Sequence, residues 1–494
     1  MYRFFRRTAS LIAFMVALVP QLMAQPNREQ EITIVHTNDV HSHVEVEPYV
    51  KGYVDALRKE NRPVVLVSAG DAFDGTPFAT LSKGMDVATV MNLTGYEVFT
   101  LGNHEQFAEV AFQDLAPKLK FPVLAANISE DWKKAVPEIR DYAIKTLGGV
   151  KIAFIGITTG VTGDESVAAL ERSRKAAAAE GADLFIGLVH LGIQDPDETI
   201  RSTYLAEHCP WLTALIDGHC HTVLPEGLVS SGVLIAQTGE FGNNIGVITL
   251  TMAGKAVIAK TARLIPIKGH EGESGITPDT EVQAFIDKAK ALNAAYLDEV
   301  VFTLPIPLAG TRDPNRRGES YFGDLLMDAL RWKTQADVAV FPGPGFRADL
   351  PEGPVTRGQV QTALYLDMPV CTVTVPGKAI LEMLEKAVSA YPQENNAFVQ
   401  QSGMQIRFKA EAPVGERLVS VTLADGTPLD PEAAYQYATK SDSLWVLPGG
   451  EEPYLPAKVL KDYTLCEVLI EYINTGTPVT GVIDHRTAPV KPEE

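Results

Sequence analysis

The chain has 494 residues, of which 46% are hydrophobic and 21% are charged. This composition excludes a disordered, collagen-like or coiled-coil protein. Because a single core stops growing at roughly 250–300 residues, we expect two large domains. The 43 basic residues against 62 acidic ones give a net charge of −19, which is atypical of proteins that bind nucleic acids, so we expect no nucleic acid as a partner. Local positive charge for an anionic substrate must then come from arginines or metal ions.

The N-terminus has the pattern of a secretory signal. Arg3, Arg6 and Arg7 precede an apolar run from residue 11 to about residue 19, and the sequence around Ala24 suits a cleavage site. We therefore predict a signal peptide over residues 1–24 and an exported protein, periplasmic or extracellular. An uncleaved membrane anchor is the alternative. A membrane helix needs about 20 consecutive apolar residues, and no later stretch of the chain supplies them. We therefore expect no membrane span after signal removal.

Residues 30–267 alternate short apolar runs with stretches of helical spacing, which is typical of an α/β domain. The helical stretches include Met85–Leu93 and Asp164–Glu180. Short, largely aliphatic runs bounded by Gly, Asp or His predict strands that are buried on both faces. The predicted strands include Ile32–Val35, Val64–Val67, Val98–Leu101, Ile152–Ile157, Leu184–Val189, Leu215–Ile216 and Val233–Ala236.

The rest of the chain predicts a connection and a second domain. Residues 268–298 begin with the Gly-rich, acidic stretch GHEGESGITPD and continue into a helix from about residue 280 to residue 297, so we expect a linker and a connecting helix. Residues 299–490 contain further apolar runs at Val338–Phe341, Val370–Val375 and Leu418–Leu423. They predict a second, smaller α/β or α+β domain.

Polar residues able to bind metals follow several of the predicted strands of the first domain. Each group lies at the carboxyl end of an apolar run, the edge at which ligands bind in open α/β sheets. Separate strands would therefore bring carboxylates, an amide and imidazoles together. This mixture of ligands suits Mn, Fe, Zn or Co better than Ca. The groups are Asp39 with His41, Asp71, Asn103 with His104, His190, and His219 with His221.

The order of these groups, D-x-H, GD, GNHE, H and GHxH, resembles the signature of the calcineurin-like metallophosphoesterases. The segments HTNDVHSH, SAGDAFDGTPFATLSKG, GYEVFTLGNHE and GHCHT resemble the secreted 5′-nucleotidase family, which includes UDP-sugar hydrolases and 2′,3′-cyclic-nucleotide phosphodiesterases. The resemblance covers nearly the whole chain after residue 24 and is stronger in the first domain. It implies a four-layer α/β/β/α sandwich for residues 30–267 and a substrate-binding 5′-nucleotidase C-terminal domain for residues 299–490.

The resemblance also implies roles for individual residues. It makes Asp71 a bridging ligand between two divalent metal ions, and His104 the catalytic residue that stabilises the transferring phosphoryl group. One ion would then be held by Asp39, His41, Asp71 and His221, and the other by Asp71, Asn103, His190 and His219.

One position beside the catalytic histidine departs from the family. The family motif reads GNHEFD, and its aspartate orients the catalytic histidine, whereas this chain reads GNHEQF. Phe107 therefore stands at the position of that aspartate. Either His104 lacks a carboxylate partner, or Glu105 or Glu109 takes its place.

Two motifs of the second domain supply candidate substrate-binding arginines. The stretches TRDPNRRGESYFGDLLMDAL and GFRADLPEG resemble the family's arginine-rich opening motif and its GIRA motif. Arg312, Arg316 and Arg347 match the family's substrate-binding arginines, whose forked donors suit phosphate and ribose oxygens. A solvated basic turn is the alternative interpretation.

The nucleoside-binding part of the family pattern is only partly present. SDSLWVLPGGEEPY resembles the family segment that stacks an aromatic ring on the base and binds the ribose hydroxyls, which assigns those roles to Trp445 and Glu451. Pro342 and Met368 replace two expected asparagines, and Leu366 replaces the second stacking ring. The alternative for Trp445 is an ordinary core aromatic.

Together these features predict an exported, two-domain, dinuclear metallophosphoesterase that hydrolyses phosphate esters of nucleotides. Its expected partner is a small-molecule nucleotide or another phosphate ester. One alternative keeps the chemistry and changes the substrate to 2′,3′-cyclic nucleotides, nucleotide sugars or non-nucleotide esters. A remote alternative is a non-catalytic ligand-binding protein on a degenerate phosphatase fold. Phe107, Pro342 and Leu366, which replace family residues, favour this alternative, and the complete set of predicted metal ligands disfavours it.

Overall fold

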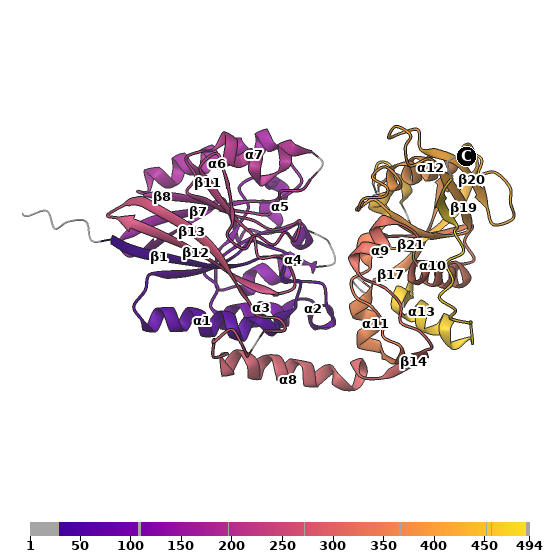
Figure 1. Ribbon diagram of the computed structural model, residues 1–494, viewed down its shortest axis with the longest axis horizontal. Coiled ribbons are helices and arrows are strands. Elements are labelled where there is room, and N and C mark those ends of the chain that lie inside the picture. The colour runs from indigo at the N-terminus through magenta and orange to yellow at the C-terminus, as the bar shows by residue number, and fades with distance from the viewer. Residues whose placement is uncertain are drawn as a thin grey trace, which may run out of the picture.

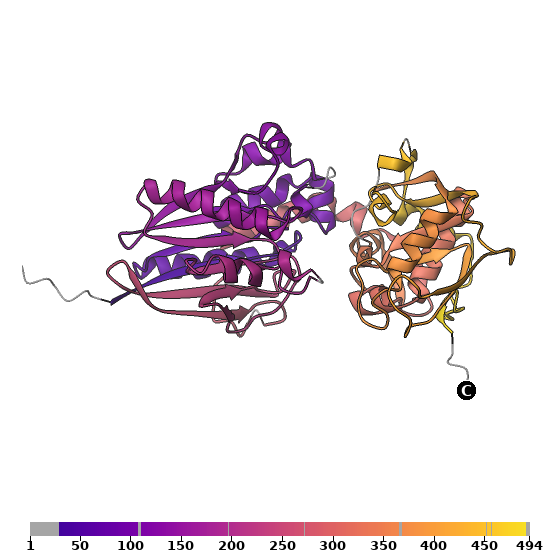
Figure 2. The ribbon, with the colours of Figure 1, turned by 90° about the horizontal axis from the view of Figure 1, so that it is seen from above.

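The computed structural model describes residues 29–106, 110–195, 197–270, 272–364, 368–450, 452–455 and 457–490, and of Arg312 and Glu452 only the backbone. Figures 1 and 2 show an N-terminal and a C-terminal domain side by side. The predicted signal peptide, residues 1–24, lies outside the described residues. Within them, no helix combines the length and the apolar character needed to cross a lipid bilayer.

The first sheet of the N-terminal domain has seven strands among the described residues. In spatial order they are β13 (Ala256–Pro266), β12 (Asn244–Ala253), β1 (Glu29–Thr37), β2 (Val64–Ser68), β3 (Val98–Thr100), β4 (Val123–Leu124) and β5 (Ile139–Arg140). Strands β1 to β5 are parallel, and β12 and β13 extend the sheet as an antiparallel hairpin. The hairpin is absent from the predicted strands, because β13 is largely exposed and no continuous aliphatic run marks it.

The second sheet of this domain, in the described part of the chain, has six strands. They are β10 (Leu228–Ser230), β11 (Val233–Ala236), β9 (Ala214–Ile216), β8 (Leu184–Val189), β7 (Val150–Ile157) and β6 (Tyr142–Leu147). Strands β7, β8, β9 and β11 are parallel. Every strand predicted in this half of the domain is present, and the bounds of β8 and β11 are those predicted.

The two sheets stack face to face and are covered by helices on both outer faces (Figure 1). Ile34 of β1 points into the core between the sheets, whereas its neighbour Val35 packs with α1 (Glu47–Lys59) and α3 (Met85–Thr94). The second sheet is covered by α6 (Gly163–Ala179) and α7 (Ser202–His208). The predicted four-layer α/β/β/α sandwich is therefore confirmed. Short helices in the connections are α2 (Pro77–Ser82), α4 (Phe112–Leu115) and α5 (Glu130–Ala135).

The C-terminal domain is built around a mixed sheet, as the prediction of a second α/β or α+β domain requires. Its strands are, in spatial order, β18 (Val399–Ser402), β15 (Val338–Pro342), β21 (Ala434–Lys440), β17 (Pro369–Pro376) and β22 (Lys458–Thr464). Helices α10 (Tyr321–Thr334), α11 (Arg357–Ala363) and α13 (Leu465–Asn474) share one core cluster, and α12 (Gly377–Ala387) contributes to another. Smaller elements are α9 (Arg312–Arg317), β14 (Val300–Leu304) with β16 (Gly353–Thr356), and β19 (Met404–Phe408) with β20 (Leu418–Leu423) and β23 (Thr487–Pro489).

Helix α8 (Thr280–Leu297) runs along the N-terminal domain to the C-terminal domain (Figure 1). Asp279 caps its start by accepting hydrogen bonds from the backbone N–H groups of residues 281 and 282. Val282 and Ile286 are buried in the same cluster as α1 and α3. At the other end the ring of Tyr296 lies 5.0 Å from the guanidinium of Arg357 in α11. The predicted connecting helix thus contacts both domains.

The burial of α8 leads to a stability prediction. Ile286 is 1% exposed and Leu292, on the same helix, is 77% exposed. Ile286→Ala should lower the free energy of unfolding by about 2–5 kcal/mol, the usual cost of truncating a buried aliphatic side chain. Leu292→Ala should change it by less than about 0.5 kcal/mol. Differential scanning calorimetry compares the two, and equal shifts would contradict the packing of α8 against the N-terminal domain.

Candidate metal centre

The predicted metal ligands lie in short segments that follow the strands, and many of them have left-handed backbone. The φ angle is 49° at Asp39, 45° at His41, 55° at Asp71, 80° at His219 and 55° at His221. Asp and His adopt this region more readily than most residues with a Cβ, and its repeated use at one site means that the surrounding structure enforces it. The turns bring side chains from both sheets together at the edge where β1 and its parallel neighbours end.

One group of donor atoms surrounds Nε2 of His221. This nitrogen lies 3.3 Å from Nε2 of His41 and 3.3 Å from Oδ1 of Asp39. Nε2 of His41 lies 3.8 Å from Oδ2 of Asp71. Donors about 2.1 Å from a tetrahedral ion are about 3.4 Å apart, so this spacing fits a divalent cation.

A second group of donor atoms surrounds Nε2 of His190. Oδ2 of Asp71 lies 3.1 Å from this nitrogen, and Oδ1 of Asn103 lies 3.2 Å from it. Nδ1 of His219 is 2.8 Å from the same asparagine oxygen. Oδ2 of Asp71 is therefore common to both groups, and the structure places all seven predicted ligands in one or the other.

Three of these histidines have their other ring nitrogen, Nδ1, directed away from the donor groups. In each case Nδ1 contacts an oxygen of a neighbouring residue. Nδ1 of His190 donates to the carbonyl oxygen of Ala69 over 2.6 Å. Nδ1 of His221 contacts Glu240, and Nδ1 of His41 lies 3.1 Å from Oδ1 of a carboxylate, Asp74. Such contacts fix the tautomer and leave the Nε2 lone pair for an ion. Sequence reasoning had identified neither of these carboxylates.

When no ion is present, the buried carboxylates of the centre favour protonation of the neighbouring imidazoles. Burial alone would lower the pKa of His190, but the carboxylates of Asp71 and Asp39 raise it to about 10. Although burial opposes it, the neighbouring histidines hold the pKa of Asp71 well below its usual range. An ion that binds through Nε2 of His190 must displace a proton, so acid weakens metal binding here.

His104 has a carboxylate partner, but not one of those that the sequence suggested. Its Nδ1 lies 2.7 Å from Oδ2 of Asp74, its backbone N–H donates to Oδ1 of Asp71 over 3.0 Å, and its Nε2 lies 3.7 Å from Oδ2 of Asp71. Burial disfavours the imidazolium, yet these two carboxylates raise the pKa of His104 above its ordinary value. Phe107 and Glu109 lie outside the described residues.

Glu105 does not replace the missing aspartate, which corrects one of the sequence alternatives. Its carboxylate is fully buried and accepts hydrogen bonds from the backbone N–H groups of Asp71, Ala72 and Gly102 at 3.0, 2.8 and 2.8 Å. Burial and the nearby Asp71 raise the pKa of Glu105 to about 7. Glu105 thus ties the turn that carries Asp71 to the turn that precedes His104.

Two family models match the two domains. Residues 32–222 match the model described as "Calcineurin-like phosphoesterase", and residues 300–453 match "5'-nucleotidase, C-terminal domain". The chain belongs to the calcineurin-like phosphoesterases of the 5′-nucleotidase family. It is accordingly a phosphoester hydrolase whose family acts on nucleotides, and its clustered carboxylates and imidazoles are candidate ligands for divalent metals.

Relatives in this family align with most of the chain at low identity. A 5′-nucleotidase of Diplobatis ommata is 25% identical over 79% of this chain and 77% of that protein. The trifunctional nucleotide phosphoesterase protein YfkN of Bacillus subtilis is 24% identical over 83% of this chain, which spans about a third (31%) of YfkN. The crystal structure of a 5′-nucleotidase precursor from Thermus thermophilus has the same fold, with a TM-score of 0.79, 24% identity, and coverage of 94% of this chain and 100% of that one.

The substrate-binding residues predicted in the C-terminal domain are only partly described. The positive charge of Arg347 opposes part of the rise in the pKa of His104, so this arginine lies within electrostatic reach of the N-terminal site. Nη1 of Arg316 donates to Oδ1 of Asn396 over 3.1 Å, and Trp445 is 49% exposed, which disagrees with a core role. The side chain of Arg312 and all of Glu451 lie outside the described residues.

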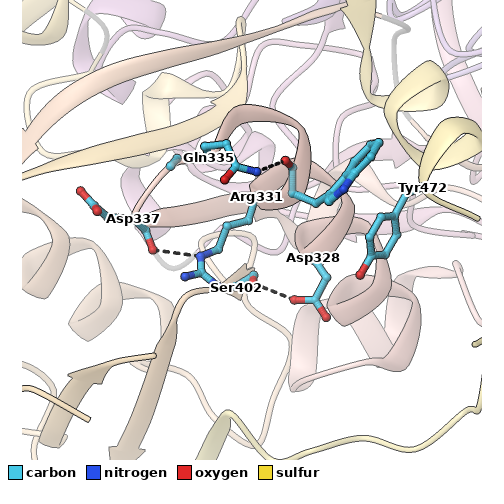
Figure 3. A pocket seen from close by; sticks show the side chains of 8 residues that line it. Asp328, Arg331, Gln335, Asp337, Ser402 and Tyr472 are labelled. Atoms are coloured by element: carbon cyan, nitrogen blue, oxygen red, sulfur yellow. Dashed lines mark hydrogen bonds between the residues drawn. The ribbon is translucent and has the colours of Figure 1, made fainter. Parts of the chain in front are cut away.

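A separate polar hollow of about 450 Å³ lies in the C-terminal domain (Figure 3). It lies between α10, α13 and the end of β18, and its walls include Asp328, Arg331, Trp332 and Tyr472. Nε of Arg331 donates to a backbone carbonyl over 3.2 Å, and Asp328 accepts from Ser402 over 2.7 Å. None of its lining residues contributes to the two donor groups.

The shared oxygen of Asp71 gives a mutational prediction. Asp71→Asn keeps a residue that tolerates left-handed backbone and an oxygen that accepts from the N–H of His104, but it replaces Oδ2 by an amide group that cannot bind an ion. The variant should keep its fold, contain less metal by mass spectrometry and lose phosphoesterase activity. Asp287→Asn, at an exposed position of α8, is the control. Full metal content with substantial activity in Asp71→Asn would refute the shared-ligand assignment.

Proposed function

We propose that the chain is an exported 5′-nucleotidase that uses two divalent ions and has weak selectivity among bases. One observation carries the proposal: Oδ2 of Asp71 is common to two donor groups and lies 3.7 Å from Nε2 of His104. A carboxylate shared between two ions beside a hydrogen-bond donor is the arrangement suited to in-line displacement at phosphorus.

The two donor groups provide a place for each ion. One ion would be held by Asp39, His41, Asp71 and His221, and the other by Asp71, Asn103, His190 and His219. Bound divalent ions supply Lewis-acid charge for the phosphoryl oxygens and lower the pKa of a water molecule. Zn, Mn, Co and Fe all suit this ligand mixture.

His104 would act directly on the phosphoryl group without binding metal. Because Nδ1 is held by Asp74, the ring directs Nε2 towards the side on which Oδ2 of Asp71 lies. An imidazolium there donates a hydrogen bond to the charge that develops on a phosphoryl oxygen. The carboxylate of Asp74 beside Nδ1 favours that protonation state.

The C-terminal domain would supply the substrate contacts. Arg347, whose charge acts on His104, would pair with a phosphate oxygen, and Arg312 and Arg316 are the other candidates for phosphate and ribose oxygens. Trp445 is exposed and able to stack on a base, and Glu451 would bind the ribose hydroxyls. The net charge of −19 argues against a nucleic-acid partner, and the arginines and apolar run at the N-terminus support export.

Metal removal combined with a panel of substrates tests the proposed activity. Incubation with a chelator should abolish hydrolysis of AMP, and Mn²⁺, Zn²⁺ or Co²⁺ added back should restore it. UDP-glucose, 2′,3′-cyclic AMP, p-nitrophenyl phosphate and a single-stranded oligonucleotide should be hydrolysed less efficiently than AMP. A higher kcat/KM on one of these would transfer the proposal to that class of ester. A metal-loaded protein inactive on all of them would favour the non-catalytic alternative.

The exposed ring of Trp445 predicts broad base use. Stacking is worth about 1–3 kcal/mol on any base, whereas selectivity requires hydrogen-bonding groups that a wrong base leaves unpaired. AMP, GMP, UMP and CMP should therefore differ by about tenfold or less in kcat/KM. Trp445→Ala should lower all four by roughly 5–150-fold and leave p-nitrophenyl phosphate nearly unchanged.

The hollow of Figure 3 supplies the matched control for Trp445. Trp332→Ala removes another partly exposed tryptophan of the same domain, 39% exposed, and should leave nucleotide hydrolysis unchanged. Equal losses for nucleotides and p-nitrophenyl phosphate in Trp445→Ala would make this residue structural. A preference above about 100-fold for one base would reveal a specificity pocket.

A further inference from the structure

Asp74 makes an unusual pair of contacts in the N-terminal site. It lies between β2 and α2, three residues after Asp71, and is 2% exposed. One carboxylate oxygen, Oδ2, lies 2.7 Å from Nδ1 of His104, and the other, Oδ1, lies 3.1 Å from Nδ1 of His41. The rings of His41 and His104 meet edge to face with centroids 4.6 Å apart. One carboxylate thus holds both a predicted metal ligand and the predicted catalytic residue.

The backbone around Asp74 holds this carboxylate in place. The N–H of Thr76 donates to Oγ of Ser42 over 2.9 Å, and the N–H of Ser42 donates to the carbonyl oxygen of Ala72 over 3.0 Å. Gly75 has a φ of 112°, and a Cβ at this position would lie 2.8 Å from the carbonyl oxygen of His41. The turn that carries Asp74 is therefore fixed against the segment that carries His41.

Among the described residues, Asp74 supplies the carboxylate closest to Nδ1 of His104. Glu105 is engaged by backbone N–H groups, and residue 107, an aspartate in the family motif, is phenylalanine in this chain. The aspartate that follows Asp71 in GDAFDG reaches the same histidine from another strand.

We propose that Asp74 is the positioning residue of His104, in place of the aspartate expected at position 107, and that it positions His41 through its other oxygen. The inference rests on the proposed role of His104. A carboxylate on Nδ1 fixes the ring orientation and keeps Nε2 directed at the site, as carboxylate partners do for metal-bound histidines. Because both rings share one partner, the orientation of the catalytic histidine is coupled to the metal-binding one.

Asp74→Asn is the first test, with p-nitrophenyl phosphate as substrate so that a failure of nucleotide specificity does not affect the result. The asparagine side chain keeps the shape of the aspartate but has only one oxygen that can accept a hydrogen bond. At saturating metal, kcat should fall about 10–100-fold with little change in KM, and the affinity of the metal-free protein for Mn²⁺ should fall about 10–100-fold. Unchanged kcat and unchanged Mn²⁺ affinity would overturn the proposal.

A matched rescue separates the two contacts. Phe107→Asp in the Asp74→Asn background restores a carboxylate at position 107, where the family motif has the aspartate that orients the catalytic histidine. It should recover kcat and leave the Mn²⁺ affinity low, whereas Phe107→Asp alone should change neither. Rescue of neither quantity by the double variant, with its fold intact by circular dichroism, would show that Asp74 acts only as a structural residue.

A double-mutant cycle tests whether Asp74 acts through His104. His104→Ala should lower kcat about 10²–10⁴-fold, the usual contribution of a positioned acid–base group, with metal retained. Asp74→Asn should then lower kcat no further, because residues that act as a unit are non-additive. A further loss of the same size in the double variant would refute the coupling.

The unmodified protein provides a measurement that does not depend on folding of a variant. Long-range proton–nitrogen NMR spectra of the metal-free chain should show a proton on Nδ1 of His104, shifted downfield by its carboxylate partner and assigned by its loss in His104→Ala. A His104 ring whose Nδ1 carries no proton would overturn the proposal regardless of activity.

Discussion

Converging buried carboxylates are the constraint on which the N-terminal domain depends. Asp39, Asp71 and Asp74 are each at most 2% exposed, and isolated buried carboxylates are costly unless they are paired or bind a cation. Histidines surround them. Asp39 and Asp71 also accept hydrogen bonds from backbone N–H groups of neighbouring turns, and Asp74 lies against Nδ1 of His104. The site therefore needs strands that end at one edge, turns that direct acids and imidazoles inward, and cations to balance them.

The same constraint explains why the turns contain glycine. A Cβ on Gly102 would lie 2.0 Å from Oδ1 of Asp71, and one on Gly218 would lie 2.6 Å from Nδ1 of His190. No larger residue fits at either position without displacing a ligand. The glycines seen in GNHE and GHCH are thus required by the close approach of two turns, and not only by local backbone geometry.

Much of the fold and of the ligand set could be predicted from the sequence. Strands such as Leu184–Val189 are marked by aliphatic runs, and parallel strands place the residues that follow them at one edge, so Asp39, Asp71 and His190 could be brought together without coordinates. Asp74 and Glu240 could not, because their partners are set by how turns from different strands meet. The alternative in which Glu105 is the partner of His104 was wrong for the same reason: sequence proximity does not reveal that a carboxylate already accepts hydrogen bonds from backbone N–H groups. The hairpin β12–β13 was missed because its second strand is largely exposed and lacks a continuous aliphatic run.

The left-handed turns link the stability of this domain to its surroundings. Each non-glycine residue held at positive φ raises the energy of the folded chain by on the order of 1 kcal/mol, and five of the seven predicted ligands are in that state. An ion that binds only the folded chain adds about 2.7 kcal/mol of stability at a free concentration 100 times its dissociation constant. The stability of the folded state is then a joint property of the chain and of the free metal around it. In a metal-poor compartment, the same sequence would unfold more readily and expose its two-sheet core to proteases.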